Sequence, residues 1–573
     1  MRRTKIVATV GPKSRDPEVL REMVRAGMDV VRINLSHGDV EDHRAVVRAV
    51  RALEAECGRP LGILFDTAGP EVRLTGLPDV GLELAAGDVV RIGSEPPALK
   101  PSWPEVVQHV APGATLLLDD GNIVLKVREA GDPLVAEVVA GGRLVNGKKL
   151  SCPGARWPLE VLTDADRAAL AMGVAEGIDW VAASFVRSAD DVFAVKRALE
   201  ELGAWIPVMA KIESALAVEA LDEIVTVADG VMVARGDLGV ELPVEQVPWL
   251  QKQIIEQAHL AGKPVVTATQ MLESMVEHPR PTRAEVTDVA NAIWDGTDAV
   301  MLSAETAVGR WPALTVATMA RIAEAADRQR PRPVRGTRRL ANVTQAVSHA
   351  SVTAAEDLGA SAIITATESG HTAEAVAHLR PTVPILAVTA RPQVARRLAV
   401  VWGVTARLME PAQNTDDMMD KAVRVALASG LVHPGDLVVL TGGVPVGQPG
   451  STNLLRVLTI GEAILRGQGI GRDAVAVGEV IVVTDVRAVI PRQVAGKILV
   501  ARATTRDWVP LIEVAAGLIV EQGGLTSHAA VVGLSLGKPT VVGARDATTR
   551  LTTGQTVTVD GQRGLVYAGT VQI

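Results

Sequence analysis

Short apolar runs recur along the chain, and a stretch with helical periodicity follows each of them. The runs begin near Lys5, Asp29, Leu61, Asp179, Pro207, Gly230, Pro264 and Ala299. Apart from one long gap after the third run, they follow one another at roughly 23 to 35 residues, the length of one strand–helix unit. Eight such units are typical of a closed (β/α)8 barrel, and this is the fold we predict for the first part of the chain.

Capping residues mark where helices should begin between these runs. Asp16 and Pro17 supply an N-cap and a first-turn proline. Thr163, with Asp166 three residues later, forms a capping-box pattern. The sequence therefore predicts helices that start just after Asp16 and just after Thr163.

The gap between the third and fourth runs has a different character. It is rich in Gly and Pro and contains short strand patterns such as 87–92 and 123–127. We expect a small β domain at 69–156, inserted into a barrel formed by 1–68 and 157–335. Loops that follow barrel strands open onto the catalytic face, so an insert there is placed to act as a lid that excludes water.

Two further boundaries divide the rest of the chain. A Pro- and Arg-rich stretch at 328–336 ends the barrel, and an alternating α/β region follows at 336–470, with strand patterns near Ala362, Pro384, Val404, Leu437 and Leu454. A weaker break at Gly467–Gly469 precedes a strand-rich segment at 471–573. We predict an α/β protein of four domains: barrel, inserted lid, open α/β domain and an extra terminal β/α domain.

Composition narrows the class of protein. The net charge of −8 argues against general nucleic-acid binding. The two cysteines are too few for a disulfide framework or a zinc site. The apolar stretch near the N-terminus is too short for a signal peptide, and no run reaches the ~18 apolar residues of a membrane span. We therefore expect a cytoplasmic protein.

Two neighbouring apolar runs end with a cation, a spacer and an acid. The first ends in Lys211-Ile212-Glu213 and the second in Arg235-Gly236-Asp237. Buried parallel strands read as continuous apolar runs, so charges at their ends need a reason. Two acids at adjacent strand ends are suited to a divalent metal, and the cations beside them to an anion. The alternative is a pair of ion pairs that closes the sheet.

The other strand ends complete a pattern. They read Arg32-Ile33-Asn34-Leu35-Ser36-His37-Gly38, Asp66-Thr67-Ala68-Gly69-Pro70-Glu71-Val72-Arg73, Thr267 to Met275, and Met301 to Thr306. Together with the Lys-Ile-Glu and Arg-Gly-Asp ends, they closely resemble the pyruvate kinase family over about residues 3 to 470. The resemblance implies a kinase that transfers the phosphoryl group of phosphoenolpyruvate to ADP, giving ATP and pyruvate in the last step of glycolysis.

The resemblance also implies roles for the strand-end residues. Glu213 and Asp237 would hold magnesium, Lys211 would stabilise the transferring phosphoryl group and the enolate, and Arg32 would bind the phosphoryl group. The substrate carboxylate would rest on the backbone N–H groups of Gly236 and Asp237 and on the Thr269 hydroxyl. Protonation of the enolate would pass through water near Thr269 and Ser303. For Arg235 two roles stay open, direct anion ligand or structural partner of the acids.

A monovalent ion and a nucleotide are implied as well. Asn34, Ser36, Asp66 and Thr67 form an all-oxygen set, and the family places potassium there. Glu71 goes with potassium dependence in the family. The ADP phosphates would be reached by Arg73, by Lys148 or its neighbour Lys149, and by His37.

Two positions depart from the family pattern. Ala68 stands where the family usually has lysine, and Ser214 stands where asparagine is common. Neither residue has an assigned chemical role, but the missing lysine puts nucleotide affinity in doubt.

The α/β region carries a candidate effector site. Its residues Thr367, Ser369, Gly370, His371 and Thr372 combine hydroxyls with backbone N–H groups at a helix start, which is typical of an anion nest. The loop 442–452 would close over it. The family binds a phosphorylated allosteric effector there and forms a homotetramer. Ordinary turn chemistry is nearly as good an explanation, and Glu368 argues against fructose bisphosphate.

The terminal segment resembles another kind of domain. The run Gly523-Gly524-Leu525-Thr526-Ser527-His528-Ala529 is similar to the swivelling phosphohistidine domain of phosphoenolpyruvate synthases and pyruvate phosphate dikinases. The alternatives to a pyruvate kinase are thus phosphotransfer through a phosphohistidine at His528, or a catalytically weak metabolite sensor. We favour a packing role for His528, because no nucleotide domain of the kind those enzymes use precedes it.

Overall fold

The structure is a computed structural model that describes residues 2–95, 98–329, 342–445, 452–460, 463–471 and 475–570. The chain forms two compact units. The first unit comprises residues 1–338, 373–380 and 391–406, and the second comprises 339–372, 381–390 and 407–573. Most of the Pro- and Arg-rich boundary and most of the loop 442–452 lie outside the described residues.

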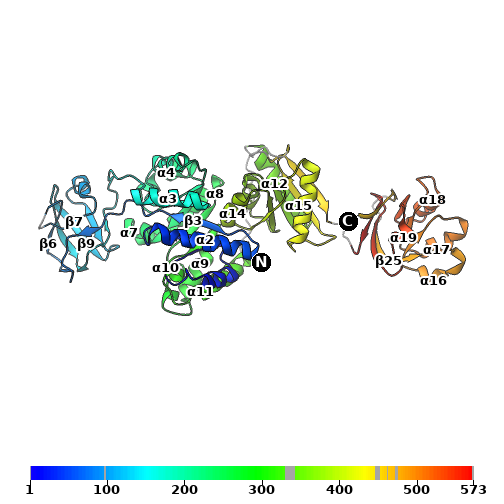
Figure 1. Cartoon of the computed structure of the whole chain (residues 1–573), viewed down its shortest axis with the longest axis horizontal. Helices are drawn as coiled ribbons and strands as arrows, with labels where there is room; N and C mark the ends of the chain where they lie inside the picture. Colours follow the sequence, from blue (N-terminus) through cyan, green and yellow to red (C-terminus); the bar gives the residue numbers. More distant parts are fainter. Residues whose placement is uncertain are drawn as a thin grey trace. The chain divides into compact units, whose positions relative to one another are not determined.

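A closed barrel of parallel strands is the centre of the first unit (Figure 1). Its strands are β1 (Lys5–Thr9), β2 (Val30–Asn34), β3 (Gly62–Asp66), β13 (Trp180–Ala183), β14 (Val208–Ile212), β15 (Gly230–Ala234), β16 (Val265–Ala268) and β17 (Ala299–Leu302). They close in the order β1-β17-β16-β15-β14-β13-β3-β2. All eight predicted runs are strands, which confirms the barrel.

Helices follow the strands and cover the barrel. They are α1 (Pro17–Ala26), α2 (Val40–Cys57), α3 (Asp164–Glu176), α4 (Ala189–Glu201), α5 (Ala215–Glu219), α6 (Leu221–Val227), α7 (Arg235–Glu241), α8 (Val247–Leu260), α9 (Arg283–Asp295), α10 (Ala304–Ala307) and α11 (Pro312–Gln329). Asp16 caps α1, and Thr163 with Asp166 forms the predicted capping box of α3. The core between strands and helices is aliphatic, with Phe65 its one buried phenylalanine among the described residues.

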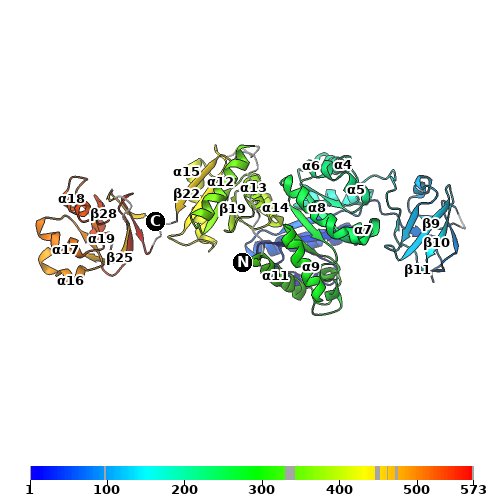
Figure 2. The same ribbon diagram turned by 180° about the vertical axis from the view of Figure 1, so that it is seen from behind.

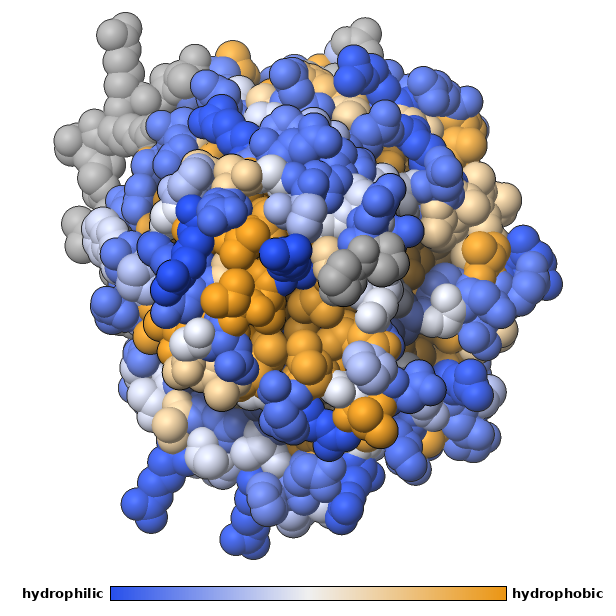
Figure 3. Space-filling model, turned by 90° about the vertical axis from the view of Figure 1, so that its left-hand side faces the viewer, coloured by the Kyte–Doolittle hydropathy of each residue, from blue (hydrophilic) through white to orange (hydrophobic). Residues whose placement is uncertain are grey.

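The insert between β3 and β13 is built of short antiparallel strands. Its main sheet has the order β12-β8-β9-β10-β6, with β6 (Val89–Ile92), β8 (Thr115–Leu118), β9 (Ile123–Glu129), β10 (Leu134–Ala140) and β12 (Leu150–Ser151). Two small pairs join β4 (Leu74–Thr75) to β7 (Lys100–Pro101) and β5 (Leu82–Leu84) to β11 (Gly142–Leu144). Although the lid has an apolar core, Val80, Val89 and Val139 are exposed. Figure 3 views the molecule from the side on which Figure 1 labels the lid strands, and it shows apolar residues gathered at the centre of that face.

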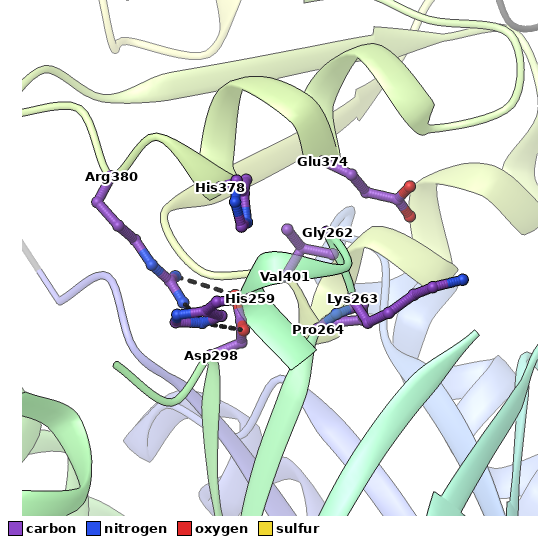
Figure 4. A pocket seen from close by; sticks show the side chains of 9 residues that line it. All are labelled: His259, Gly262, Lys263, Pro264, Asp298, Glu374, His378, Arg380 and Val401. Atoms are coloured by element: carbon purple, nitrogen blue, oxygen red, sulfur yellow. Dashed lines mark hydrogen bonds and ion pairs between the residues drawn. The ribbon is translucent and has the colours of Figure 1, made fainter. Parts of the chain in front are cut away.

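An ion network lies at the end of the barrel where strands begin (Figure 4). Asp298, just before β17, accepts a hydrogen bond from the Val265 N–H of β16 at 3.0 Å and pairs with Arg380 Nη1 at 2.9 Å. Arg380 Nη2 contacts the Gly296 carbonyl at 2.6 Å and His259 Nε2 at 2.8 Å. Burial opposes the charge of Asp298, but Arg380 and His259 hold its pKa well below the usual value. The network fixes the starts of β16 and β17.

The chain that follows the barrel forms two further sheets. The first has the order β20-β19-β18-β21-β22, with β18 (Ala362–Ala366), β19 (Ile385–Thr389), β20 (Val404–Leu408), β21 (Leu437–Gly442) and β22 (Leu454–Thr459). Its chain segment also forms α12 (Val343–Asp357), α13 (His371–His378), α14 (Pro392–Arg397) and α15 (Thr415–Ala428). The predicted strand positions near Ala362, Pro384, Val404, Leu437 and Leu454 are thus confirmed.

The terminal segment forms an eight-stranded mixed sheet. Its order is β23-β30-β29-β25-β26-β27-β28-β24. The strands are β23 (Ala463–Arg466), β24 (Gln468–Ile470), β25 (Val475–Val482), β26 (Ile498–Ala501), β27 (Gly517–Val520), β28 (Thr540–Val542), β29 (Thr556–Asp560) and β30 (Leu565–Ala568). The helices are α16 (Pro491–Val494), α17 (Val509–Val514), α18 (His528–Ser535) and α19 (Ala547–Arg550). A β/α domain at the end of the chain is the kind of domain that we predicted, but β23 and β24 lie before residue 471, where we expected it to begin.

Candidate active site

Lys211, near the end of β14, is the centre of a charged cluster at the end of the barrel where strands terminate. Its side chain is 10% exposed, and its Nζ lies 3.1 Å from Asp66 Oδ1 and 2.7 Å from Glu213 Oε1. Arg32 on β2 contacts Asp66 Oδ2 at 2.6 Å. Three strands thus bring two cations and two carboxylates into direct contact.

The pKa values of the two carboxylates in this cluster, Asp66 and Glu213, are shifted in opposite directions. Burial disfavours the charge of Asp66, but Arg32 and Lys211 hold its pKa below the usual value. Burial raises the pKa of Glu213, and the nearby charge of Asp237 adds to that rise. The negative charges of Glu213 and Asp237 therefore oppose each other, which is the electrostatic situation that a bound cation relieves.

The lid reaches this cluster through Lys149. Its Nζ pairs with Asp237 Oδ1 at 2.6 Å and lies 5.0 Å from the centre of the Phe185 ring. Although burial opposes ionisation of Asp237, Lys149 and Lys211 lower its pKa. Lys148, by contrast, pairs with Asp119 inside the lid at 2.5 Å. Of the two adjacent lysines, Lys149 contacts the cluster.

Both roles expected for Arg235 stay predictions, because the carboxylate that it contacts is neither Glu213 nor Asp237. Its guanidinium contacts Asp288 on α9 at 2.7 Å and the Thr269 carbonyl at 2.7 Å. Longer contacts of 3.3 Å reach the carbonyls of Ala268 and Gln270. The side chain is thus occupied by a carboxylate and by the backbone that follows β16.

That backbone segment is a tight turn with two residues in the left-handed region. Thr269 has φ 66° and Gln270 has φ 53°, which is costly for residues with a Cβ. The turn aims the Thr269 hydroxyl at the Gly236 N–H, which donates to it at 2.8 Å. Gly236 and Thr269 are therefore adjacent, although 33 residues separate them.

Ser303 follows β17 at the same end of the barrel. Its N–H donates to Glu305 at 2.6 Å, and Glu305 also accepts from the Leu272 N–H at 3.1 Å. The Ser303 hydroxyl is buried and has no hydrogen-bond partner in the described part of the chain. A buried hydroxyl without a partner is costly, so it is suited to a water or a substrate group.

The predicted all-oxygen set lies at the ends of β2 and β3. Asn34 Oδ1 accepts from the Ser36 N–H at 3.2 Å, and Asp66 carries the two ion pairs already described. The Thr67 carbonyl accepts from the Ser184 hydroxyl at 2.6 Å. The oxygens of this set belong to adjacent strands of the barrel, β2 and β3.

The predicted nucleotide residues lie at the lid hinge and beside β2. Arg73 donates to the Gly147 carbonyl at 2.7 Å and pairs closely with Glu71. His37 is exposed, and its N–H contacts the Asn34 carbonyl at 3.4 Å. At Ala68 the backbone N–H donates to Asp166 at 2.8 Å, so the turn holds its shape without the family's lysine.

Sequence reasoning did not single out Ser184 and Phe185. They follow β13, and no charged residue stands directly at the end of that strand. Ser184 contacts Lys211 at 2.7 Å, and the Phe185 N–H donates to Glu213 at 2.8 Å. Reading every strand end of a predicted barrel, and not only the charged ones, would have found them.

In the second unit, the candidate effector residues form local contacts. Thr367 Oγ1 accepts from the Gly370 N–H at 2.9 Å, and the hydroxyls of Thr372 and Thr452 lie 2.8 Å apart. Ser369 and His371 are exposed. In the terminal domain, His528 begins α18 and its Nδ1 lies 3.0 Å from Thr504 Oγ1.

The barrel and its cluster define a class of enzyme. Charged groups for a metal and an anion meet where parallel strands end, under an inserted lid, and this arrangement suits phosphoryl transfer. Within the described residues, no helix is long and apolar enough to cross a membrane.

Comparison with known proteins identifies the family. The family described as "Pyruvate kinase, barrel domain" matches residues 1–316, "Pyruvate kinase, alpha/beta domain" matches 345–458, and "PEP-utilising enzyme, mobile domain" matches 493–564. Pyruvate kinases from Geobacillus stearothermophilus and Bacillus licheniformis are 46% and 43% identical, over 99% and 100% of this chain and the same shares of their own lengths. A pyruvate kinase structure from Cryptosporidium parvum is 35% identical with a TM-score of 0.76, covering 80% of this chain and 96% of that one. The chain therefore belongs to the pyruvate kinase family, and it is a phosphotransferase with that family's activity.

Proposed function

We propose that the cluster around Lys211 transfers the phosphoryl group of phosphoenolpyruvate to ADP. The observation that carries this proposal is the position of the Lys211 ammonium, buried between Asp66 and Glu213. A fixed cation there neutralises charge on the moving phosphoryl group and on the enolate that it leaves. Arg32, held by Asp66, would bind the same phosphoryl group from the neighbouring strand.

Magnesium would be held by Glu213 and Asp237. Their mutual repulsion fits a divalent cation, and oxygen is the ligand type that magnesium prefers. Among the described residues, no group of three or more His, Cys, Asp or Glu side chains is arranged to hold a metal, so substrate oxygens and water would complete the set. When bound, the metal neutralises charge on the substrate's carboxylate and phosphate.

The substrate carboxylate would be received by Gly236, Asp237 and Thr269. The Gly236 N–H donates to the Thr269 hydroxyl. A bound substrate carboxylate would replace the hydroxyl as the acceptor of that N–H and would also accept a hydrogen bond from the hydroxyl. Ser303, with its buried and unpartnered hydroxyl, supports a water-mediated route for the proton that converts the enolate into pyruvate.

Potassium would be held by Asn34, Ser36, Asp66 and Thr67. The atoms of these residues that would bind the ion, among them the Thr67 carbonyl, are all oxygens, the ligand atoms that suit a hard cation. Glu71 pairs with Arg73 and brings no positive charge to this set of oxygens. A monovalent ion would therefore supply that positive charge. Arg73, Lys148, Lys149 and His37 would contact ADP when the lid closes.

We further propose regulation and assembly as the family implies. Exposed apolar side chains on or next to α8 and α9, which lie side by side in Figure 2, support a homotetramer: Val244, Trp249, Leu260, Val286 and Trp294. Light scattering tests this, and a monomer would contradict it. Thr367, Ser369, Gly370, His371 and Thr372 are proposed to bind a phosphorylated effector, and the enzyme's place would be the cytoplasm.

The function is tested by a coupled pyruvate assay on the full chain. We expect ADP-dependent pyruvate formation that requires magnesium and rises with potassium. Adding AMP, ribose 5-phosphate or fructose bisphosphate identifies the effector by a lower half-saturation concentration of phosphoenolpyruvate. Turnover that does not depend on ADP would overturn the proposal.

A further inference from the structure

The hydroxyl of Ser184 connects two groups that the proposed function assigns to different tasks. Lys211 Nζ donates to Ser184 Oγ at 2.7 Å, while Oγ lies 2.6 Å from the Thr67 carbonyl and 3.2 Å from Asp66 Oδ1. A hydroxyl has one proton to donate and can accept from two donors. The shorter distance assigns that proton to the Thr67 carbonyl.

The backbone around Ser184 is equally fixed. Its N–H donates to Thr67 Oγ1 at 3.0 Å, and the Thr67 N–H donates to the Ala182 carbonyl at 3.0 Å. Ser184 itself is 2% exposed. The hydroxyl therefore has no other position to adopt, and its contacts follow from the packing of β13 against β3.

The next residue extends the same turn to the metal acids and the lid. Phe185 has φ 56°, and its N–H donates to Glu213 Oε2 at 2.8 Å. A Cβ on Gly69 would lie 2.7 Å from the Phe185 ring, so the ring packs where Gly69 has no side chain. The turn at 184–185 thus contacts the potassium set, the catalytic lysine and a metal acid.

We propose that Ser184 is a positioning residue that couples the monovalent-cation set to Lys211. This inference rests on the proposed function. The Ser184 hydroxyl proton orients the Thr67 carbonyl that would bind potassium, and the Ser184 hydroxyl oxygen accepts one N–H of the Lys211 ammonium. Without it, the ammonium is left to Asp66 and Glu213 alone, and the carbonyl loses its orientation.

The substitution Ser184→Ala is expected to lower kcat and weaken the response to potassium together. Removing a residue that orients a metal ligand typically costs about 10- to 100-fold in metal affinity or activity. We expect kcat to fall by that factor, the half-saturating potassium concentration to rise severalfold, and KM for phosphoenolpyruvate to change little, because Ser184 would not touch substrate. Ser184→Cys keeps the shape of the side chain but has a weaker hydrogen-bonding group. Its kcat and its response to potassium should lie between those of the wild type and Ser184→Ala.

Thr315→Val is the matched control. Thr315 is fully buried on α11, and its hydroxyl donates to the carbonyl of Trp311, the residue just before that helix, at 2.9 Å. The variant loses a buried hydroxyl in the same barrel without altering the cluster. Both variants and the wild type are compared by steady-state kinetics and by thermal unfolding in potassium chloride and in tetramethylammonium chloride.

The proposal predicts that potassium raises Tm for the wild type and Thr315→Val, and raises it less for Ser184→Ala. Ser184→Ala with the kinetics and potassium-dependent Tm shift of Thr315→Val would overturn it. A wild type that turns over but responds equally to the two salts would overturn the potassium assignment as well. A wild type without ADP-dependent turnover would instead show that the proposed function itself fails.

Discussion

Arg235 offers a quantitative test of how the substrate-binding turn is held. Its guanidinium contacts the carbonyls of Thr269 and Gln270, the two residues of the turn after β16 that have positive φ. It also contacts Asp288. Each left-handed residue costs of the order of 1–3 kcal/mol and persists only where its surroundings fix it. Arg235→Ala removes the cation that fixes this turn.

The magnitude follows from the separate contacts. A hydrogen bond from a charged group, here to the Thr269 carbonyl, contributes about 1.5–3 kcal/mol. The ion pair adds about 0–1 kcal/mol, because the Asp288 side chain is 38% exposed. We expect a loss of about 1.5–4 kcal/mol in the free energy of unfolding. If about 2–3 kcal/mol of this is expressed in positioning the Thr269 hydroxyl, kcat falls about 30- to 150-fold.

Asp288→Asn is the matched control, because it removes the ion pair and leaves the carbonyl contacts of Arg235 in place. We expect it to change kcat less than about threefold, in line with the small ion-pair contribution. The assay is steady-state pyruvate formation, with denaturant unfolding of each variant for stability. Arg235→Ala within threefold of the wild type, or Asp288→Asn as damaging as Arg235→Ala, would refute the reasoning.

Three further changes test other parts of the molecule. Lys149→Met should lower kcat/KM for ADP about tenfold, the size of one charge-assisted hydrogen bond to Asp237, and Lys148→Met much less; equal effects would contradict the lid contact. Burial raises the pKa of Glu374 to about 7 at the barrel end in Figure 4, so its ionisation destabilises the fold as pH rises from about 4.5 through 7. Glu374→Gln should therefore have a higher Tm than the wild type at pH 8 and the same Tm at pH 4; no difference at pH 8 would count against the buried acid. His528→Ala should keep pyruvate formation within twofold, whereas its loss would favour a phosphohistidine route.

The sequence predicted the barrel well because buried parallel strands have continuous runs of apolar residues. Each of the eight barrel strands begins within a residue of its predicted position. The caps at Asp16 and Thr163 were equally readable, since capping depends on neighbours in sequence. These features are local, and local patterns are what a single sequence contains.

The charged residues of the site could be predicted from the sequence, but the residues that they contact could not. The ends of β14 and β15 indicated Lys211, Glu213 and Asp237, but adjacent lysines in the lid gave no sign that Lys149 would reach Asp237. The role of Arg235 depended on carbonyls more than 30 residues away. Ser184 looked like an ordinary turn residue, because its function comes from oxygens on β3 that only the closed barrel brings near.

The central claim, that the buried Lys211 ammonium stabilises the transferred phosphoryl group, is tested most directly by Lys211→Met. The measurement is ADP-dependent pyruvate formation by the wild type and the variant, with magnesium and potassium present and with Tm recorded for both. The account predicts ready turnover by the wild type and a loss of at least about a hundredfold in kcat for a variant that remains folded. A folded Lys211→Met enzyme with wild-type kcat would contradict it.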